Sequence, residues 1–176
     1  MQGVLGIDTA GPVVGTAFYH PQMSAAWEMR IVRGADAKLA PAVADLLAAH
    51  SVGWVAVSVG PGSFTSLRVG VATALGVAFS KATKVIPICS LMARAALIRQ
   101  PTSLALLDAR KNRVYGQLFD AEPDVPVPLG KPVDVPIEEL LPKDDFGRLV
   151  REPYAIGRML LMLVGEFRLM LIDLRP

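Results

Sequence analysis

The chain has 176 residues, of which 52% are hydrophobic and 19% are charged. This composition is too apolar for a disordered protein and provides enough material for a packed core. The formal net charge is only +2, and the basic residues are scattered, so no surface for direct nucleic-acid binding is indicated. A single cysteine, Cys89, excludes an intramolecular disulfide and fits a reducing compartment.

No leader peptide or membrane segment is expected from the sequence. Residues 1–8 contain no basic region and only a short apolar run. The apolar run at 69–79 is much shorter than the ~20 residues that a membrane helix needs. We therefore expect a cytoplasmic protein that does not bind a membrane.

The first third of the chain predicts three strands and a helix. Apolar runs at 4–8, 13–19 and 25–32 predict strands close enough in sequence to form an antiparallel meander. The segment 33–36 has no core anchor and is expected to be irregular. One apolar face over 38–50 predicts an amphipathic helix with Pro41 in its first turn; this face contains Leu39, Val43, Leu46 and Leu47.

A second pair of strand and helix follows, joined by a glycine-rich turn. Residues 54–59 predict a buried strand, the turn is Gly60-Pro61-Gly62, and a helix is expected from Leu67 to Phe79. Further along, 85–88 predicts a short strand and 90–99 a helix with Ser90 as its N-cap. The expected order is therefore β-β-β-α-β-α-β-α.

The beginning of this pattern occurs again near residue 104. Residues 104–108 repeat the apolar strand ending in aspartate that is found at 4–8, and a second strand is expected at 114–119. We therefore predict an N-terminal domain over 1–100 and a truncated second domain over 101–176. The proline-rich stretch 121–136 predicts a loop or an edge segment. Helices are expected at 136–141 and 153–164, and a strand at 168–174.

Two loops at predicted strand ends are candidates for phosphate binding. Asp8 could orient Mg²⁺ or water near a phosphate, or it could bond backbone N–H groups of its own turn. The turn after Val59 lies before a helix N-terminus, which favours an anion, but it lacks the lysine of a P-loop, and Pro61 removes one donor. The candidate residues are Asp8, Thr9, Gly60, Gly62, Ser63 and Thr65.

The helix at 67–79 is the strongest physical signal, because it is apolar on every side. Gly70, Ala74 and Ala78 form a stripe of small residues beside a stripe of large ones. A smooth stripe beside a ridge allows another helix to approach closely, so we expect a second subunit to cover this helix. The predicted interface consists of Leu39, Val43, Leu47, Leu67, Gly70, Val71, Ala74, Leu75 and Ala78.

Several of these segments resemble the bacterial TsaB (YeaZ) family, a glycoprotease-like branch of the actin/Hsp70/sugar-kinase superfold. The resemblance is dense over 3–119. It is carried by the motifs at residues 5–10, 60–65, 67–70 and 107–110. The chain departs from the family at Ser66, where glycine is usual, at 33–36, which lacks the usual histidine, and in its short second half.

This resemblance implies an α/β fold of two RNase H-like β-β-β-α-β-α domains, with the second one shortened. It also implies a role in making threonylcarbamoyladenosine in tRNAs that read ANN codons, as a subunit that is not the catalyst and holds no metal or other cofactor. The implied partners are a TsaD-like catalytic subunit and a TsaE-like ATPase, with tRNA contacted only through the complex. Without its partner, the protein is expected to form a homodimer through its two N-terminal-domain helices.

Two other function classes remain as alternatives. An ATP-dependent phosphotransferase of the same superfold would need a second glycine loop, and the stretch after Asp108 has none. A metallopeptidase would need clustered ligands, and the two histidines, His20 and His50, stand apart in the sequence.

Overall fold

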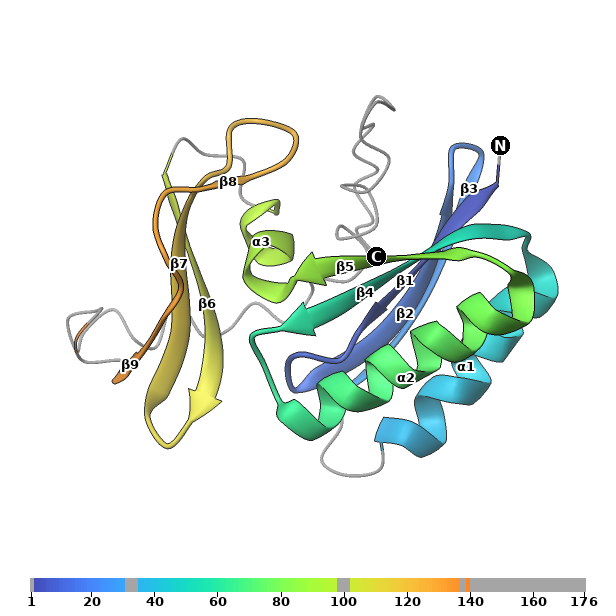
Figure 1. Cartoon of the computed structure of the whole chain (residues 1–176), viewed down its shortest axis with the longest axis horizontal. Coiled ribbons are helices and arrows are strands. Elements are labelled where there is room, and N and C mark those ends of the chain that lie inside the picture. Colours follow the sequence, from blue (N-terminus) through green and yellow to red (C-terminus); the bar gives the residue numbers. More distant parts are fainter. Residues whose placement is uncertain (1, 31–34, 98–101, 137–138, 140–176) are drawn as a thin grey trace.

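The computed structural model describes residues 2–30, 35–97, 102–136 and 139. Within these residues the chain forms two β-sheets and three helices (Figure 1). The elements are β1 (Gly3–Asp8), β2 (Val13–His20), β3 (Met23–Arg30), α1 (Ala35–Ala49), β4 (Val52–Gly60), α2 (Phe64–Lys81), β5 (Lys84–Cys89), α3 (Ser90–Ala95), β6 (Ser103–Arg110), β7 (Arg113–Asp120), β8 (Val127–Pro128) and β9 (Val133–Pro136).

The first sheet has the strand order β3-β2-β1-β4-β5. The pairs β1–β2 and β2–β3 are antiparallel, which confirms the predicted meander, whereas β4 pairs parallel with both β1 and β5. Every residue of β1 is buried because the strand lies at the centre of a sheet that is covered on both faces. Its unbroken apolar run has the same cause.

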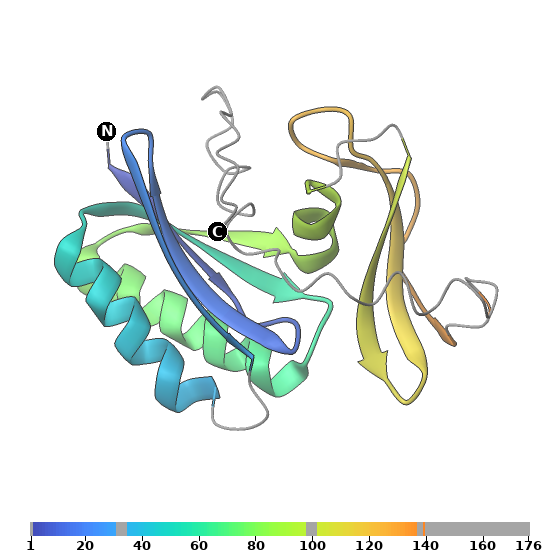
Figure 2. The same ribbon diagram turned by 180° about the vertical axis from the view of Figure 1, so that it is seen from behind.

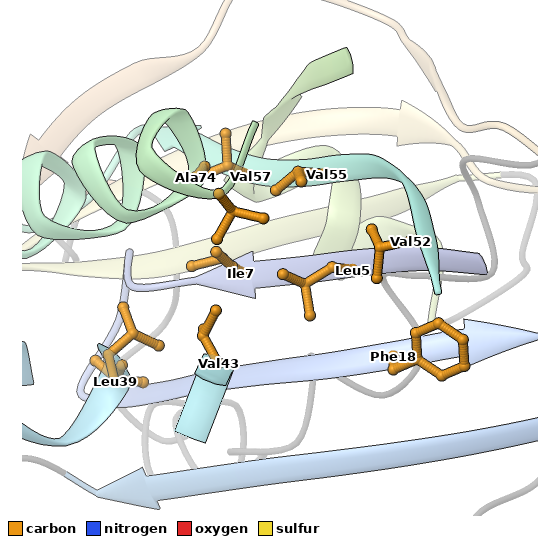
Figure 3. Close-up of a cluster of buried hydrophobic side chains, with 11 residues drawn as sticks. Leu5, Ile7, Phe18, Leu39, Val43, Val52, Val55, Val57 and Ala74 are labelled. Atoms are coloured by element: carbon orange, nitrogen blue, oxygen red, sulfur yellow. The ribbon is translucent and has the colours of Figure 1, made fainter. Parts of the chain in front are cut away.

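Helices α1 and α2 lie side by side on one face of this sheet (Figure 1). Alternate residues of the central strands point to this face, and the helices contribute Leu39, Val43, Ala74 and Val77 to the same core (Figure 3). The main hydrophobic core therefore lies between the first sheet and the helix pair. None of the helices in the described part of the chain is both long and apolar enough to span a membrane.

Helix α3 lies between the two sheets, as the view from behind shows (Figure 2). Ala93 packs with Val4 and Ala56 on the second face of the first sheet. Leu91 and Ala95 pack with residues of the second sheet, including Phe119, which is fully buried. This one-and-a-half-turn helix therefore contributes to two cores.

The second sheet is built around the hairpin β6–β7. Strand β7 pairs antiparallel with β6 on one side and with both β8 and β9 on the other. The repeat predicted from residues 104–108 is thus a real strand hairpin. The proline-rich stretch, expected to be a loop or an edge segment, contributes these two short edge strands, β8 and β9.

Four local predictions need correction. Helix α1 begins at Ala35, so Pro41 lies beyond the first turn, inside the helix, where it offers no N–H for hydrogen bonding. For the same reason Ala35 and Asp36 are helical rather than irregular. Helix α3 ends at Ala95 rather than 99, and its N-cap is Cys89, because Ser90 already has a helical place in the first turn.

Other predictions concern residues outside the described part of the chain. These are the irregular positions 33 and 34, the strand end at 31–32, the elements expected at 153–164 and 168–174, and most of the helix expected at 136–141. The boundary at residue 100 also falls outside the described ranges. The division into domains 1–100 and 101–176 remains a prediction.

Neighbouring alanines on α2 provide a test of which face is internal. Ala74 is 0% exposed and belongs to the main core, whereas Ala72 is exposed. Ala74→Arg places an unpaired charge in that core, so we expect it to lower the free energy of unfolding by about 3–5 kcal/mol. Ala72→Arg is the matched control and should change this free energy little. Urea unfolding followed by circular dichroism measures both, and equal stabilities would contradict the packing of α2.

Candidate functional site

The carboxylate of Asp8 is engaged within its own turn. Its Oδ1 accepts a hydrogen bond from the backbone N–H of Ala10 at 3.0 Å, and its Oδ2 lies 3.9 Å from a guanidinium nitrogen of Arg94. The side chain is almost fully buried. This geometry matches the turn role considered for Asp8. Among the described residues, no group of three His, Cys, Asp or Glu side chains is placed to hold a metal ion.

The loop after β4 packs against the turn that contains Asp8. The backbone N–H of Ser63 donates to the carbonyl oxygen of Ala10 at 3.0 Å, and the Thr9 N–H donates to Ser58 Oγ at 3.2 Å. A Cβ atom on Gly62 would lie 2.5 Å from the Ala10 oxygen and 2.8 Å from its Cα. Glycine is therefore required here so that two backbone segments can approach closely.

Two backbone positions in this loop offer no free N–H group to a phosphate. Pro61 has no N–H, and the N–H of Ser63 already bonds Ala10. Gly60, the last residue of β4, has a φ of +115°, a backbone conformation that favours glycine. Ser63 is the N-cap residue of α2, but its hydroxyl accepts a hydrogen bond from Ser66 Oγ instead of capping a backbone N–H. Thr65 is exposed in the first turn.

The turn of the second sheet also lacks phosphate-binding geometry. Lys111 and Asn112 connect β6 to β7 with φ of 52° and 57°, as in the two-residue turns typical of hairpins. Arg110, with φ of 67°, precedes them, and its N–H donates to Asp108 Oδ1. Nearby, Arg113 pairs with Asp134 at 2.9 Å.

Four of the nine predicted interface residues are buried within the chain, so the prediction needs correction at these positions. A Cβ on Gly70 would overlap the Thr9 hydroxyl, so α2 touches the β1–β2 turn there. Ala74 lies in the main core with Leu39 and Val43 of α1. The small-residue stripe therefore seats α2 on its own sheet. The four buried residues are Leu39, Val43, Gly70 and Ala74.

The remaining predicted residues divide between the core and the surface. Leu47 and Val71 are partly buried against the main core, and Leu67 packs against the core that Leu91 and Ala95 of α3 share with the second sheet. Ala78 is half-buried. Of the predicted set, only Leu75 is clearly exposed, at 55%.

The outward face of α2 carries a stripe that the sequence analysis identified only in part. We call it the α2 stripe: Phe64, Arg68, Ala72, Leu75, Gly76 and Phe79. Phe79 is 93% exposed and Phe64 is 67% exposed, which is unusual for large aromatic side chains. The signal was present in the sequence, because Arg68 is the one charged residue within the predicted helix and marks the side that faces water.

The outward face of α1 lies beside this stripe. Helix α1 is exposed mainly at small or apolar residues, with Lys38 and Asp45 as the charged positions on that face. The small residues there are Ala37, Ala40, Ala44 and Ala48. Because small side chains allow a second helix to approach, these alanine positions of α1 suit a helix–helix contact.

Comparisons with known proteins agree with this architecture. A family model described as "TsaD: tRNA N6-adenosine threonylcarbamoyltransferase" matches residues 34–124, more than half of the chain. A protein of Haemophilus influenzae named tRNA threonylcarbamoyladenosine biosynthesis protein TsaB is 40% identical over 87 residues. The chain belongs to the TsaD family that this model describes. The match to the Haemophilus protein covers 44% of this chain and 37% of that relative.

Solved structures extend the TsaB/YeaZ likeness over most of the chain. YeaZ from Pseudomonas aeruginosa has a TM-score of 0.76 at 23% identity, and the match covers 94% of this chain and 92% of that one. A second structure, described as similar to peptidase YeaZ from Pseudomonas aeruginosa, has a TM-score of 0.75 at 23% identity, covering 94% and 91%. At this identity the likeness concerns the fold. The predicted RNase H-like, actin-like α/β fold is confirmed.

The close contact of Gly62 with Ala10 can be tested with alanine substitutions at two glycines, which should change the free energy of unfolding in opposite directions. Gly62→Ala forces backbone atoms apart and should lower the free energy of unfolding by about 1–3 kcal/mol. Gly76→Ala meets nothing within 4 Å, lies inside α2, and should raise stability by up to about 1 kcal/mol. Thermal unfolding of both variants measures the effect. A neutral Gly62→Ala would contradict the docking of the loop on the β1–β2 turn.

Proposed function

We propose that this chain is a non-catalytic subunit in the biosynthesis of threonylcarbamoyladenosine in tRNA, and that it acts by binding a TsaD-like catalytic subunit. Its membership of the TsaD family, its YeaZ-like fold and the name of the Haemophilus relative support the process. The observation that carries the proposal of a partner is the α2 stripe. A TsaE-like ATPase and tRNA would be contacted in the assembled complex.

The α2 stripe has the properties of a protein-binding surface. Leu75 and Phe79 lie one helical turn apart and are exposed together on an 18-residue helix. Large apolar patches are rare on the surface of monomers and mark interaction sites. A stable interface buries about 800 Å² on each partner, and two adjacent helices of 15 and 18 residues are large enough for that area.

The same surface also suits a homodimer when the partner is absent. A two-fold symmetric contact uses the same patch on both copies, and in such a contact the exposed Asp45 of α1 would have to serve as the acceptor for Arg68 of the second copy. Helices with small residues at their contact can approach closely. The homodimer and the heterodimer would then compete for α2.

The proposed absence of catalysis rests on how the polar groups near Asp8 are used. The Asp8 carboxylate accepts a hydrogen bond from the Ala10 N–H and lies near Arg94. The N–H of Ser63, in the loop before α2, donates to the Ala10 carbonyl oxygen. These contacts stabilise the junction between the loops. The alternative of a phosphotransferase has less support, because the second-sheet turn at 111–112 is a glycine-free hairpin connection.

The proposed interface can be tested by charge insertion. Leu75→Glu or Phe79→Glu would bury a carboxylate in a dry contact, so we expect each to weaken binding to the TsaD-like subunit of the same organism by at least about tenfold, or ~1.4 kcal/mol. Leu129→Glu is the matched control, since Leu129 is 56% exposed and lies beyond β8. Isothermal titration calorimetry measures all three. Unchanged binding of both α2 variants would refute the proposed interface.

The non-catalytic role has its own test. The purified chain should show no magnesium-dependent ATP hydrolysis, because no free carboxylate is offered at the β1 end. Asp8→Ala should therefore leave a phosphate-release assay at the background level. Hydrolysis by the wild-type chain that disappears in Asp8→Ala would instead favour the phosphotransferase.

A further inference from the structure

Arg68 is the single charged residue of the α2 stripe, and an aromatic ring holds it in place. Its guanidinium carbon lies 3.9 Å from the centroid of the Phe64 ring, one turn earlier on the helix. Both side chains are exposed. A guanidinium stacked on an aromatic face is a favourable cation–π contact, and stacking limits the directions in which the side chain can point.

The stacking leaves the hydrogen-bonding capacity of Arg68 unused. A guanidinium has five N–H donors and no acceptor. Helix α2 contains no aspartate or glutamate between Phe64 and Lys81, and within the described part of the chain no ion pair involves Arg68. Because Arg68 is exposed, these donors face solvent.

Docking of the α2 stripe changes this situation. Arg68 lies on the same face as Leu75 and Phe79, so a partner that covers those side chains also removes water from the guanidinium. A buried charge without a partner is strongly unfavourable. The surface that binds α2 must therefore provide an acceptor for Arg68 if the whole stripe is covered.

We infer that the TsaD-like partner presents an aspartate or glutamate opposite Arg68, beside an apolar recess for Phe64. This inference rests on the proposed function. A carboxylate matches the planar guanidinium in a bidentate pair, which fixes orientation as well as position. Phe79 lies 11 residues away, about 16 Å along the helix, and needs no carboxylate on the partner. The pair therefore sets the direction in which the partner binds.

A nucleic-acid phosphate is the other acceptor that this cation could meet. Phosphate backbones are bound by groups of basic residues, and the next basic residue on α2 is Lys81, about 20 Å along the helix. The side chains around Arg68 on the stripe are apolar. A single arginine in an apolar surface fits a protein carboxylate better than an RNA backbone.

The experiment compares Arg68→Glu, Arg68→Lys and Lys84→Glu in titration calorimetry against the TsaD-like subunit. Lys84 is the matched control, because it also lies over an aromatic ring, 5.0 Å from the centroid of Trp54, but outside the stripe. We expect Arg68→Glu to weaken binding by about 100-fold or more, and Arg68→Lys by about tenfold, because lysine cannot form the bidentate pair. Lys84→Glu should bind as the wild type does.

A second arm identifies the acceptor. Each exposed carboxylate of the partner is changed to arginine in turn, and one such variant should restore binding to Arg68→Glu. Wild-type affinity in Arg68→Glu, with Leu75→Glu weakened, would refute the carboxylate while the proposed interface stands. A loss of tRNA retention by the assembled complex in Arg68→Glu, with unchanged binding to the subunit, would assign Arg68 to RNA and refute the inference. Failure of the wild-type chain to bind would refute the proposed function itself.

Discussion

The structure depends on how closely α2 approaches the turn between β1 and β2. Two glycines allow this approach. Gly62 lets the loop before α2 contact the backbone of Ala10, and Gly70 lets the helix itself contact Thr9. Because side chains at either position would separate the two segments, the start of α2 is fixed on the first sheet. That position determines which residues of an almost wholly apolar helix face the core.

The outward face of α2 follows from this constraint. Once Gly70 and Ala74 face the sheet, the opposite side of the helix must carry Phe79, Leu75 and Arg68. The burial of these apolar side chains is left incomplete within the chain. Helix α2 thus packs on the sheet through its small residues, Gly70 and Ala74. This packing leaves the large residues Leu75 and Phe79 exposed on the opposite side of the helix.

Much of the fold could be predicted from the sequence. The strands from β1 to β7 and helices α1 and α2 have strong periodicity or unbroken apolar runs, and all were expected in the right order. Apolar periodicity could not assign the outward face of α2, because both sides of the helix are apolar, and Arg68 was the only residue in the sequence of the predicted helix that marked the side facing water. The deciding contacts, between Gly70 and Thr9 and between Gly62 and Ala10, join residues more than 50 positions apart. Asp8 was ambiguous for the same reason, since its partner Arg94 is distant in sequence.

Helix α3 has a consequence for how the molecule unfolds. Its six residues contribute Ala93 to the core of the first sheet and Leu91 and Ala95 to the core of the second. Neither core is complete when this helix is displaced. Loss of order in one sheet therefore removes stabilising contacts from the other, which couples the two sheets thermodynamically. A short buried helix of this kind makes the two sheets unfold together, in a single cooperative transition.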